Sequence, residues 1–214
     1  MSGTVYAEGD EFVRGLRGLA YHEAGHAVVD ALLHRRLQSV TLIRQFDGDR
    51  VVSATGVTTT KGPIWWYGMS GEQEYRAVER EAVSLVAGAM GAELGLGTCA
   101  VGGLSGPDRR HLHTALCYLA ADESGGDSTP ALREAIQEQV TKTARNLLTK
   151  HRRALHCVAK ALQIRGTLSG CEVRTILRQE KRRPNSARPR SGEGERQGDT
   201  RKEPSIQDPL SGSC

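Results

Sequence analysis

Aromatic residues are scarce in this chain: they make up 4% of its 214 residues, including two tryptophans and two phenylalanines. A core with so few rings must be filled mainly by alanine, leucine and valine, which favours close-packed helices over a large β-sandwich. The chain also lacks any run of about eighteen apolar residues, so we expect no membrane span. Its N-terminus lacks a basic segment followed by an apolar run, so we expect no secretory signal peptide and a cytoplasmic location.

The five cysteines do not form a site that the sequence can identify. No two of them have C-x-x-C spacing, which excludes the usual cysteine zinc site and the thiol redox motif. Scattered and odd in number, they suit incidental thiols in a reducing compartment. The net charge of +4 is modest and lies partly in the C-terminal tail, so it does not by itself argue for a nucleic-acid partner. A phosphate-binding G-x-x-x-x-G-K-[ST] loop is absent as well, so we expect no ATP site.

What the chain does contain is an H-E-x-x-H motif, His22-Glu23-Ala24-Gly25-His26. Apolar residues recur around it at helical spacing, which predicts a helix over residues 11–36. His22 and His26 then lie one turn apart on one face and can bind a single Zn²⁺ through ring nitrogens. Glu23 can serve as the general base that takes a proton from a zinc-activated water, as in a metallopeptidase. A chance match would bury these three residues without partners, which is costly.

The rest of the chain predicts a mainly α domain with a small antiparallel β hairpin. Residues 38–60 have the alternation and the polar turn of that hairpin. Residues 1–10 are expected to be flexible and residues 181–214 a disordered basic and polar tail, because neither contains enough apolar surface to fold. After the hairpin we expect a loop at 61–69 that holds Trp65-Trp66-Tyr67, and then a helix from a capping box at Ser70 and Gln73 to Leu96. A second helix is expected to begin near Pro107, and a long helix to run from Thr129-Pro130 to Arg165 with a break near Lys150. A short helix should follow a capping box at Ser169 and Glu172.

A catalytic zinc usually has three protein ligands, and the motif supplies two. Asp108 is the first candidate for the third, because it follows a glycine-rich turn at the start of a helix. The same position also suits an acid that interacts with the helix dipole. Glu93, on the apolar face of the preceding helix, is the alternative ligand, or a second-shell partner of a zinc-bound histidine.

Several blocks of the sequence resemble, in the same order, motifs of the peptidase domain of FtsH-type ATP-dependent zinc metalloproteases. Residues 22–27, HEAGHA, match that family's first motif letter for letter. The other blocks are individually weaker but agree with it: they are SVTLI at 39–43 with GVT at 56–58, AGAMGAE at 87–93, GLSGPD at 103–108 and GTLSGCEV at 166–173.

This resemblance implies an FtsH-like zinc metallopeptidase domain over residues 11–180, with His22, His26 and Asp108 as zinc ligands and Glu23 as catalytic base. The chain departs from the family pattern at Gly106-Pro107, where the family has a single asparagine, and it lacks the arginine of the family's G-G-R-A-A-E helix. It also lacks the family's ATPase module and membrane anchor. The resemblance therefore implies the peptidase part standing alone.

We therefore expect a zinc-dependent metalloendopeptidase with one zinc per chain and a polypeptide substrate. The hairpin edge at Gly56, Val57 and Thr58 is expected to line the substrate groove by pairing with an extended peptide. A separate ATPase or a second copy of the chain are candidate partners. Two alternatives stay open: a regulatory protease that cleaves one specific repressor or toxin, and a catalytically idle metal-binding partner module.

Overall fold

The computed structural model describes residues 10–47, 50–60, 71–97, 104–126 and 128–182. The chain divides into two units, residues 1–183 and 184–214, and every described residue belongs to the first. The predicted aromatic loop at 61–69, residues 1–9 of the N-terminus predicted to be flexible over 1–10, and most of the predicted tail lie outside the described residues. Asp10, the last residue of that N-terminal prediction, is instead the first residue of a helix. Lys181 and Arg182 are helical, so the tail cannot begin at residue 181 as predicted.

Helices dominate the described part, which confirms the predicted mainly α fold with a small antiparallel sheet. None of these helices is long and apolar enough to cross a membrane. The elements in chain order are α1 (Asp10–Leu32), β1 (Leu37–Asp47), β2 (Arg50–Thr60), α2 (Gly71–Leu96), α3 (Gly106–Ser124), α4 (Pro130–Lys150), α5 (Arg152–Arg165), β3 (Thr167–Ser169) and α6 (Gly170–Arg182).

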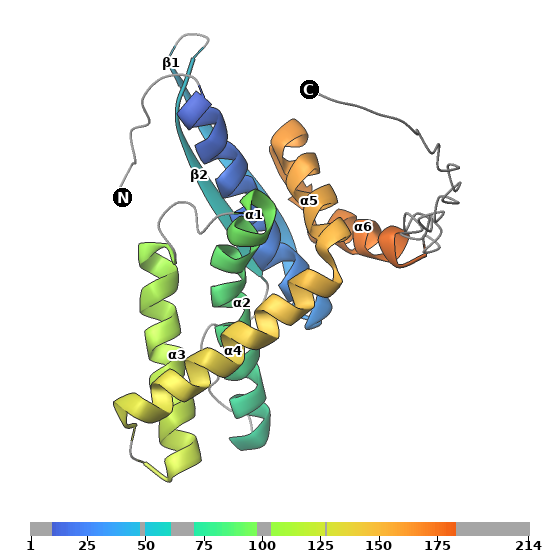
Figure 1. Cartoon of the computed structure of the whole chain (residues 1–214). Helices are drawn as coiled ribbons and strands as arrows, with labels where there is room; N and C mark the ends of the chain where they lie inside the picture. Colours follow the sequence, from blue (N-terminus) through green and yellow to red (C-terminus); the bar gives the residue numbers. More distant parts are fainter. Residues whose placement is uncertain (1–9, 48–49, 61–70, 98–103, 127, 183–214) are drawn as a thin grey trace, which may run out of the picture. The chain divides into compact units, whose positions relative to one another are not determined.

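Helix α1 is the central element of the domain. It packs against α2, α4, α5, α6 and the hairpin, so most of its second half is buried. Figure 1 shows α1 running beside the hairpin, with α4 crossing α2 and α3. Glycines bring α1 and α2 close together, because a Cβ at Gly25 would overlap the carbonyl of Ala87 and one at Gly91 would lie 2.5 Å from the carbonyl of Tyr21. This close crossing places the backbone of α2 directly against the motif face of α1.

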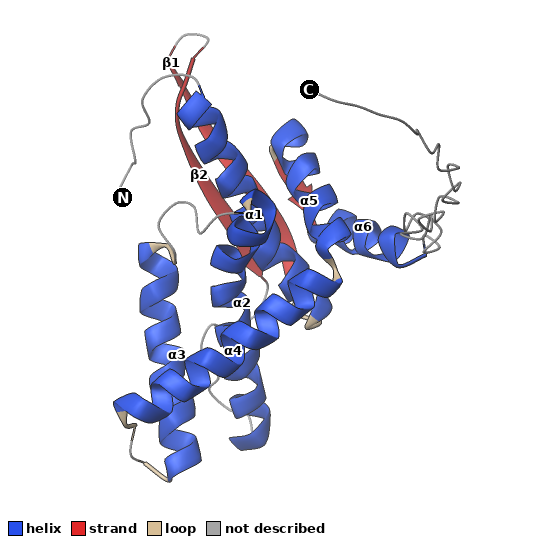
Figure 2. Ribbon diagram, viewed as in Figure 1, coloured by secondary structure: helices blue, strands red, loops and turns tan. Residues whose placement is uncertain are grey.

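The sheet has the strand order β2-β1-β3 and is antiparallel throughout (Figure 2). The hairpin predicted over 38–60 is confirmed, and its register pairs Leu42 with Gly56 and Val40 with Thr58. Strand β3 was not predicted, because three residues are too short to show an alternating pattern. It pairs with β1, so β2 has only one partner strand among the described residues and forms an edge of the sheet.

Helix α1 ends at Leu32, four residues before the predicted end. His34 adopts a positive φ of 57°, and the backbone N–H of Arg35 donates to the carbonyl of Asp30, 2.8 Å away. This turn frees Leu37 to begin β1, where it is buried and faces Thr60. Sheet pairing therefore prevails over the helical periodicity of residues 33–36.

Several predicted helix boundaries are confirmed by their caps. The long helix is broken at His151, between α4 and α5, as the sequence indicated near Lys150. Ser169 and Glu172 form the predicted capping box: the N–H of Ser169 donates to Glu172 Oε2 at 2.7 Å, and the N–H of Glu172 donates to Ser169 Oγ at 3.3 Å. Thr129 caps α4 through the N–H of Leu132.

Candidate metal centre

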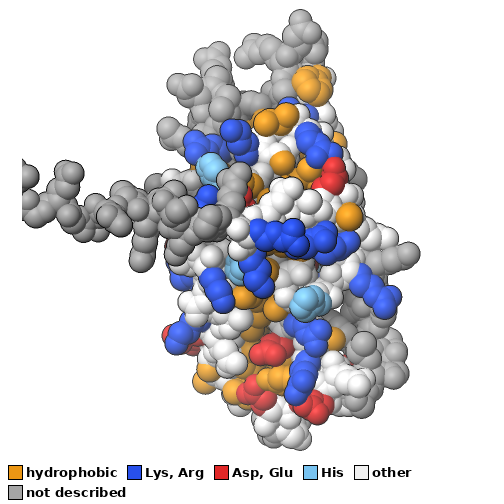
Figure 3. All heavy atoms as spheres, turned by 90° about the vertical axis from the view of Figure 1, so that its right-hand side faces the viewer, with side chains coloured by type: hydrophobic (Ala, Val, Ile, Leu, Met, Phe, Trp, Pro, Cys, Tyr) orange, Lys and Arg blue, Asp and Glu red, His pale blue; other side chains and the backbone are white. Residues whose placement is uncertain are grey.

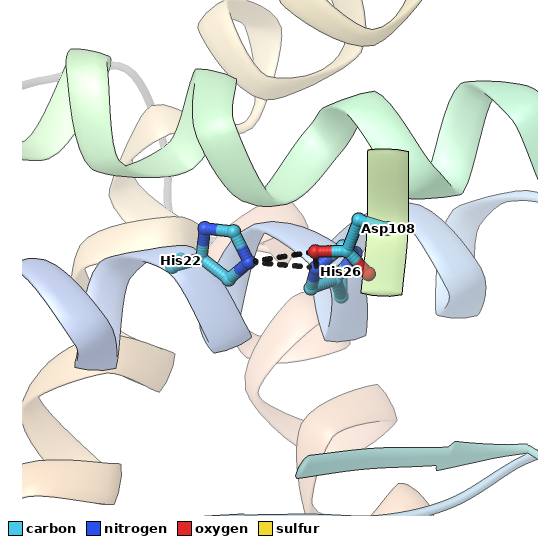
Figure 4. Close-up of side chains that lie close together, drawn as sticks. All are labelled: His22, His26 and Asp108. Carbon is cyan, nitrogen blue, oxygen red and sulfur yellow. Dashed lines mark hydrogen bonds and ion pairs between the residues drawn. The ribbon is translucent and has the colours of Figure 1, made fainter. Parts of the chain in front are cut away.

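His22, His26 and Asp108 come together into one group that can hold a metal ion. The two histidines project from α1, and Asp108 reaches them from the first turn of α3, 86 residues along the chain from His22 (Figure 4). The three side chains are largely buried but keep 10–18% of their surface exposed. The group is therefore accessible to a small ligand.

The spacing of the three ligand atoms fits a single metal ion. His22 Nε2 lies 3.1 Å from His26 Nε2 and 3.2 Å from Asp108 Oδ2, and His26 Nε2 lies 3.5 Å from the same oxygen. Zinc–ligand distances of about 2.0–2.1 Å in a tetrahedral site separate two ligand atoms by about 3.3 Å. The observed triangle thus has the size that such an ion requires.

The imidazole of His26 is fixed in the tautomer that metal binding needs. Its Nδ1 lies 2.8 Å from the backbone carbonyl of Ser84 on α2. A carbonyl can only accept, so Nδ1 carries the proton and the lone pair of Nε2 points into the site. Sequence reasoning did not identify Ser84, and it could not have done so because the contact is made by a backbone atom.

The carboxylate of Asp108 is positioned by the residue that caps its helix. Ser105 is the N-cap of α3: its Oγ accepts from the N–H of Asp108 at 3.2 Å and donates to Asp108 Oδ2 at 2.6 Å. One serine therefore begins the helix and holds the ligand oxygen near the histidines. With Gly106-Pro107 before it, Asp108 lies within reach of both rings.

A missing side chain on α2 provides the space for an ion. A Cβ at Gly88 would lie 2.6 Å from His22 Nε2 and still closer to His26 Nε2. Real Cβ atoms essentially never come this close to a neighbour. Only glycine at this position leaves both nitrogens open on the side facing α2. The donor set, the spacing and this gap all fit a bound metal ion.

The electrostatics of the group favour a positive charge at its centre. Burial lowers the pKa of His26, but the hydrogen bond with Asp108 and the charges of Glu23, Asp108 and Asp30 outweigh it and raise that pKa to about 9. Burial also opposes the charge on Asp108, yet its hydrogen bonds with His22, His26 and Ser105 hold the pKa of its carboxyl well below the usual range. In the metal-free protein the proton on His26 thus supplies the positive charge that a bound metal ion would otherwise supply.

Glu23 lies beside the group and contacts the edge strand β2. Thr58 Oγ1 donates to Glu23 Oε2 at 2.8 Å, and a Cβ at Gly56 would overlap the Glu23 carboxylate. Glu23 is 6% exposed. Of the predicted groove residues, Gly56 and Thr58 therefore face Glu23, while Val57 points to the other face of the sheet and is 43% exposed.

Sequence reasoning missed a partly buried ionic network that begins at Asp30, one turn after His26 on α1. Arg35 donates to Asp30 Oδ1 at 2.7 Å and to Glu81 of α2, and Asp30 is 2% exposed. Asp30 follows His26 by four residues on the same stripe of α1, which was the available sequence signal. Its charge is one of those that raise the pKa of His26.

Glu93, the alternative ligand, interacts elsewhere. Both of its carboxylate oxygens accept from the guanidinium of Arg145 on α4, at 2.7 and 3.1 Å. The metal-ligand group identified among the described residues is complete without it.

No protein-family model matches the chain, and no match to it was found among curated proteins.

Proposed function

We propose that this chain is a zinc-dependent metalloendopeptidase related to the peptidase domain of the FtsH-type proteases. The observation that carries the proposal is the convergence of His22, His26 and Asp108 around a space of zinc size, with Glu23 next to them on the same helix. The resemblance of residues 22–27 and 103–108 to the family's ligand motifs points to the same residues.

Zinc is the metal that this donor set favours. Two imidazole nitrogens and one carboxylate oxygen leave a fourth tetrahedral position open, as in catalytic rather than structural zinc sites. A zinc ion bound there would lower the pKa of a water to about 7 and polarise the carbonyl of a peptide bond. His22, His26 and Asp108 would hold it.

Glu23 is the residue that moves the proton. Its carboxylate accepts a proton from the attacking water and passes it to the amine that leaves when the peptide bond breaks. Thr58 limits the orientation of the carboxylate by donating to Oε2. The bare backbone of Gly56 lets Glu23 and the edge strand lie in contact.

The substrate we propose is an extended polypeptide. Strand β2 is an edge strand that passes Glu23, and its outer backbone groups can pair with a peptide laid alongside it. A tightly folded domain, held by about 5–15 kcal/mol, rarely offers such a segment. Unfolded chains, flexible tails, or substrates delivered by a separate ATPase are therefore the expected targets in a cytoplasmic setting.

The decisive test separates metal binding from chemistry. Glu23→Gln keeps the shape of the side chain but cannot accept the proton, so we expect one zinc per chain and a drop in kcat of about 10²- to 10⁴-fold. The readouts are metal analysis of the purified protein and cleavage of an unstructured peptide library. A wild-type protein that binds zinc but cleaves no peptide would instead favour an idle metal-binding module.

A further inference from the structure

The charge of this chain is strongly segregated along the sequence. Residues 141–182 contain eleven lysines and arginines but two glutamates, a net charge of +9. Because the whole chain carries +4, the remaining residues carry −5. The positive segment comprises the second half of α4 with all of α5 and α6. It contains none of the candidate metal or catalytic residues.

The fold exposes every cation of this segment and pairs both of its acids with arginines. All eleven lysines and arginines are exposed. The two glutamates lie in the seam between α5 and α6, where Glu180 pairs with Arg153 at one end and Glu172 pairs with Arg165 at the other. Arg145 pairs with Glu93. The other eight cations have no carboxylate partner among the described residues; they are Lys142, Lys150, Arg152, Lys160, Arg174, Arg178, Lys181 and Arg182.

These cations form rows that lie next to one another. On α5, Arg152, His156 and Lys160 are exposed at four-residue spacing, and on α6 Arg174 and Arg178 repeat the pattern. The Arg153–Glu180 and Arg165–Glu172 pairs hold the two helices antiparallel, so the rows run side by side. Figure 3 shows lysines and arginines gathered across this side of the molecule.

The rows converge at one end. His151 joins α4 directly to α5, and Arg153 in the first turn of α5 pairs with Glu180 in the last turn of α6. The last turn of α4, the first of α5 and the last of α6 therefore meet there. We call the surface made by the exposed cations of residues 142–182 the basic face.

We propose that the basic face binds the phosphate backbone of nucleic acid. Seven of the eleven cations are arginines, whose planar guanidinium can bind phosphate through two parallel hydrogen bonds. Of the large apolar residues exposed in the described part, Ile164 alone lies on α4–α6. A membrane-binding surface would combine such a basic face with several apolar anchors. The partner is thus a polyanion recognised by charge, and this function is separate from peptide cleavage.

The test measures binding of the full chain to a labelled duplex DNA of about 20 base pairs by fluorescence anisotropy, over salt from about 50 to 200 mM. The variant Lys160→Glu with Arg174→Glu reverses two unpaired cations of the basic face. We expect it to weaken binding by about tenfold or more and to reduce the slope of log K against log salt by about 2. The zinc content and peptide cleavage of this variant should equal those of the wild type. A failure of the DNA-binding proposal would therefore leave the proposed peptidase activity intact.

The matched control is Arg36→Glu with Arg80→Glu, which changes the net charge equally but at exposed positions outside the basic face. It should keep nearly all of the DNA affinity. Absence of binding at the lowest salt, or equal weakening by the control, would overturn the proposal. So would tighter binding to phosphatidylserine vesicles or to polyglutamate than to the duplex, because the basic face would then serve a membrane or an acidic protein.

Discussion

Gly88→Ala is the substitution that most directly tests whether the space between the two histidines holds a metal ion. The change adds one methyl group to α2 and touches none of the three ligands chemically. An alanine in a helix interior is ordinarily favourable by about 0.5–1 kcal/mol relative to glycine. Any loss of function must therefore come from where the methyl group lies.

The structure gives the magnitude of the clash. The added Cβ would be 2.6 Å from His22 Nε2 and closer to His26 Nε2, whereas an unstrained contact needs about 3.5 Å. Each ring must retreat by about 1 Å, and moving a side chain off its rotamer costs about 0.5–1.5 kcal/mol. Metal sites tolerate ligand displacements of about 0.2 Å. Both nitrogens would thus be lost as ligands, and zinc affinity should fall further than the about 10- to 100-fold typical of outer-shell substitutions.

The assay is competitive zinc titration against a chromogenic chelator, together with thermal unfolding in EDTA. Gly71→Ala on the same helix is the matched control, because a Cβ there meets nothing within 4 Å. The control should bind zinc and unfold in EDTA as the wild type does. Gly88→Ala should unfold at a lower temperature in EDTA, because the displacement of the two rings costs more than the added helix preference of alanine gains. Wild-type zinc affinity in Gly88→Ala would refute the placement of the metal between α1 and α2.

Three further predictions concern the side chains around this space. Asp108→Ala should reduce zinc affinity severely while Glu93→Ala leaves it nearly unchanged, because the Glu93 carboxylate is bound by an arginine; the opposite ranking in the same titration would make Glu93 the ligand. Thr58→Val keeps the shape of the side chain but removes a charge-assisted hydrogen bond to Glu23, which is worth about 1.5–3 kcal/mol. We therefore expect kcat to fall by about 10- to 100-fold while the zinc content stays unchanged. An unchanged kcat would contradict the role of Thr58 in positioning Glu23. The metal-free protein gains stability from the raised pKa of His26, and this gain is fully present below pH 6.5 and lost as the pH rises through about 9. The free energy of unfolding, measured with denaturant in EDTA, should therefore fall by at most roughly 3 kcal/mol over that pH range. An unchanged free energy of unfolding would show that His26 stays neutral.

The elements that the sequence predicted well are those whose signals are local. The periodicity around His22, the alternation in the hairpin and the capping box at Ser169 each involve residues within a few positions of one another. Local backbone geometry decides such features, so one sequence suffices to predict them. The pairing of His22 with His26 belongs to the same class, because four-residue spacing on a helix fixes their common face.

The features that the sequence could not predict depend on packing between distant segments. Glu93 lies on a partly buried helix face, which made it a candidate ligand, but only the packing of α2 against α4 shows that Arg145 neutralises it. Strand β3 is too short to have a pattern of its own and exists because β1 offers it an edge. In the sequence, nothing distinguishes Gly88 from the many other glycines and alanines. Only the crossing of α1 over α2 shows that a side chain at this position would clash with His22 and His26.

Both local sequence and packing between distant segments determine how each reactive group is held. Three groups carry the proposed chemistry, and each is oriented by a partner from a different part of the fold: His26 by a carbonyl of α2, Asp108 by the N-cap of its own helix, and Glu23 by a hydroxyl on β2. A short motif thus supplies His26 and Glu23, whereas contacts with α2, with the N-cap of α3 and with β2 set the positions of the three groups. Because a misplacement of about 1 Å can cost about 10²-fold in rate, substitutions of Ser105 and Thr58, whose side chains make two of these contacts, should impair activity even though neither is a ligand or a base. A protein that had kept the motif only as a relic would have no such need for its partners.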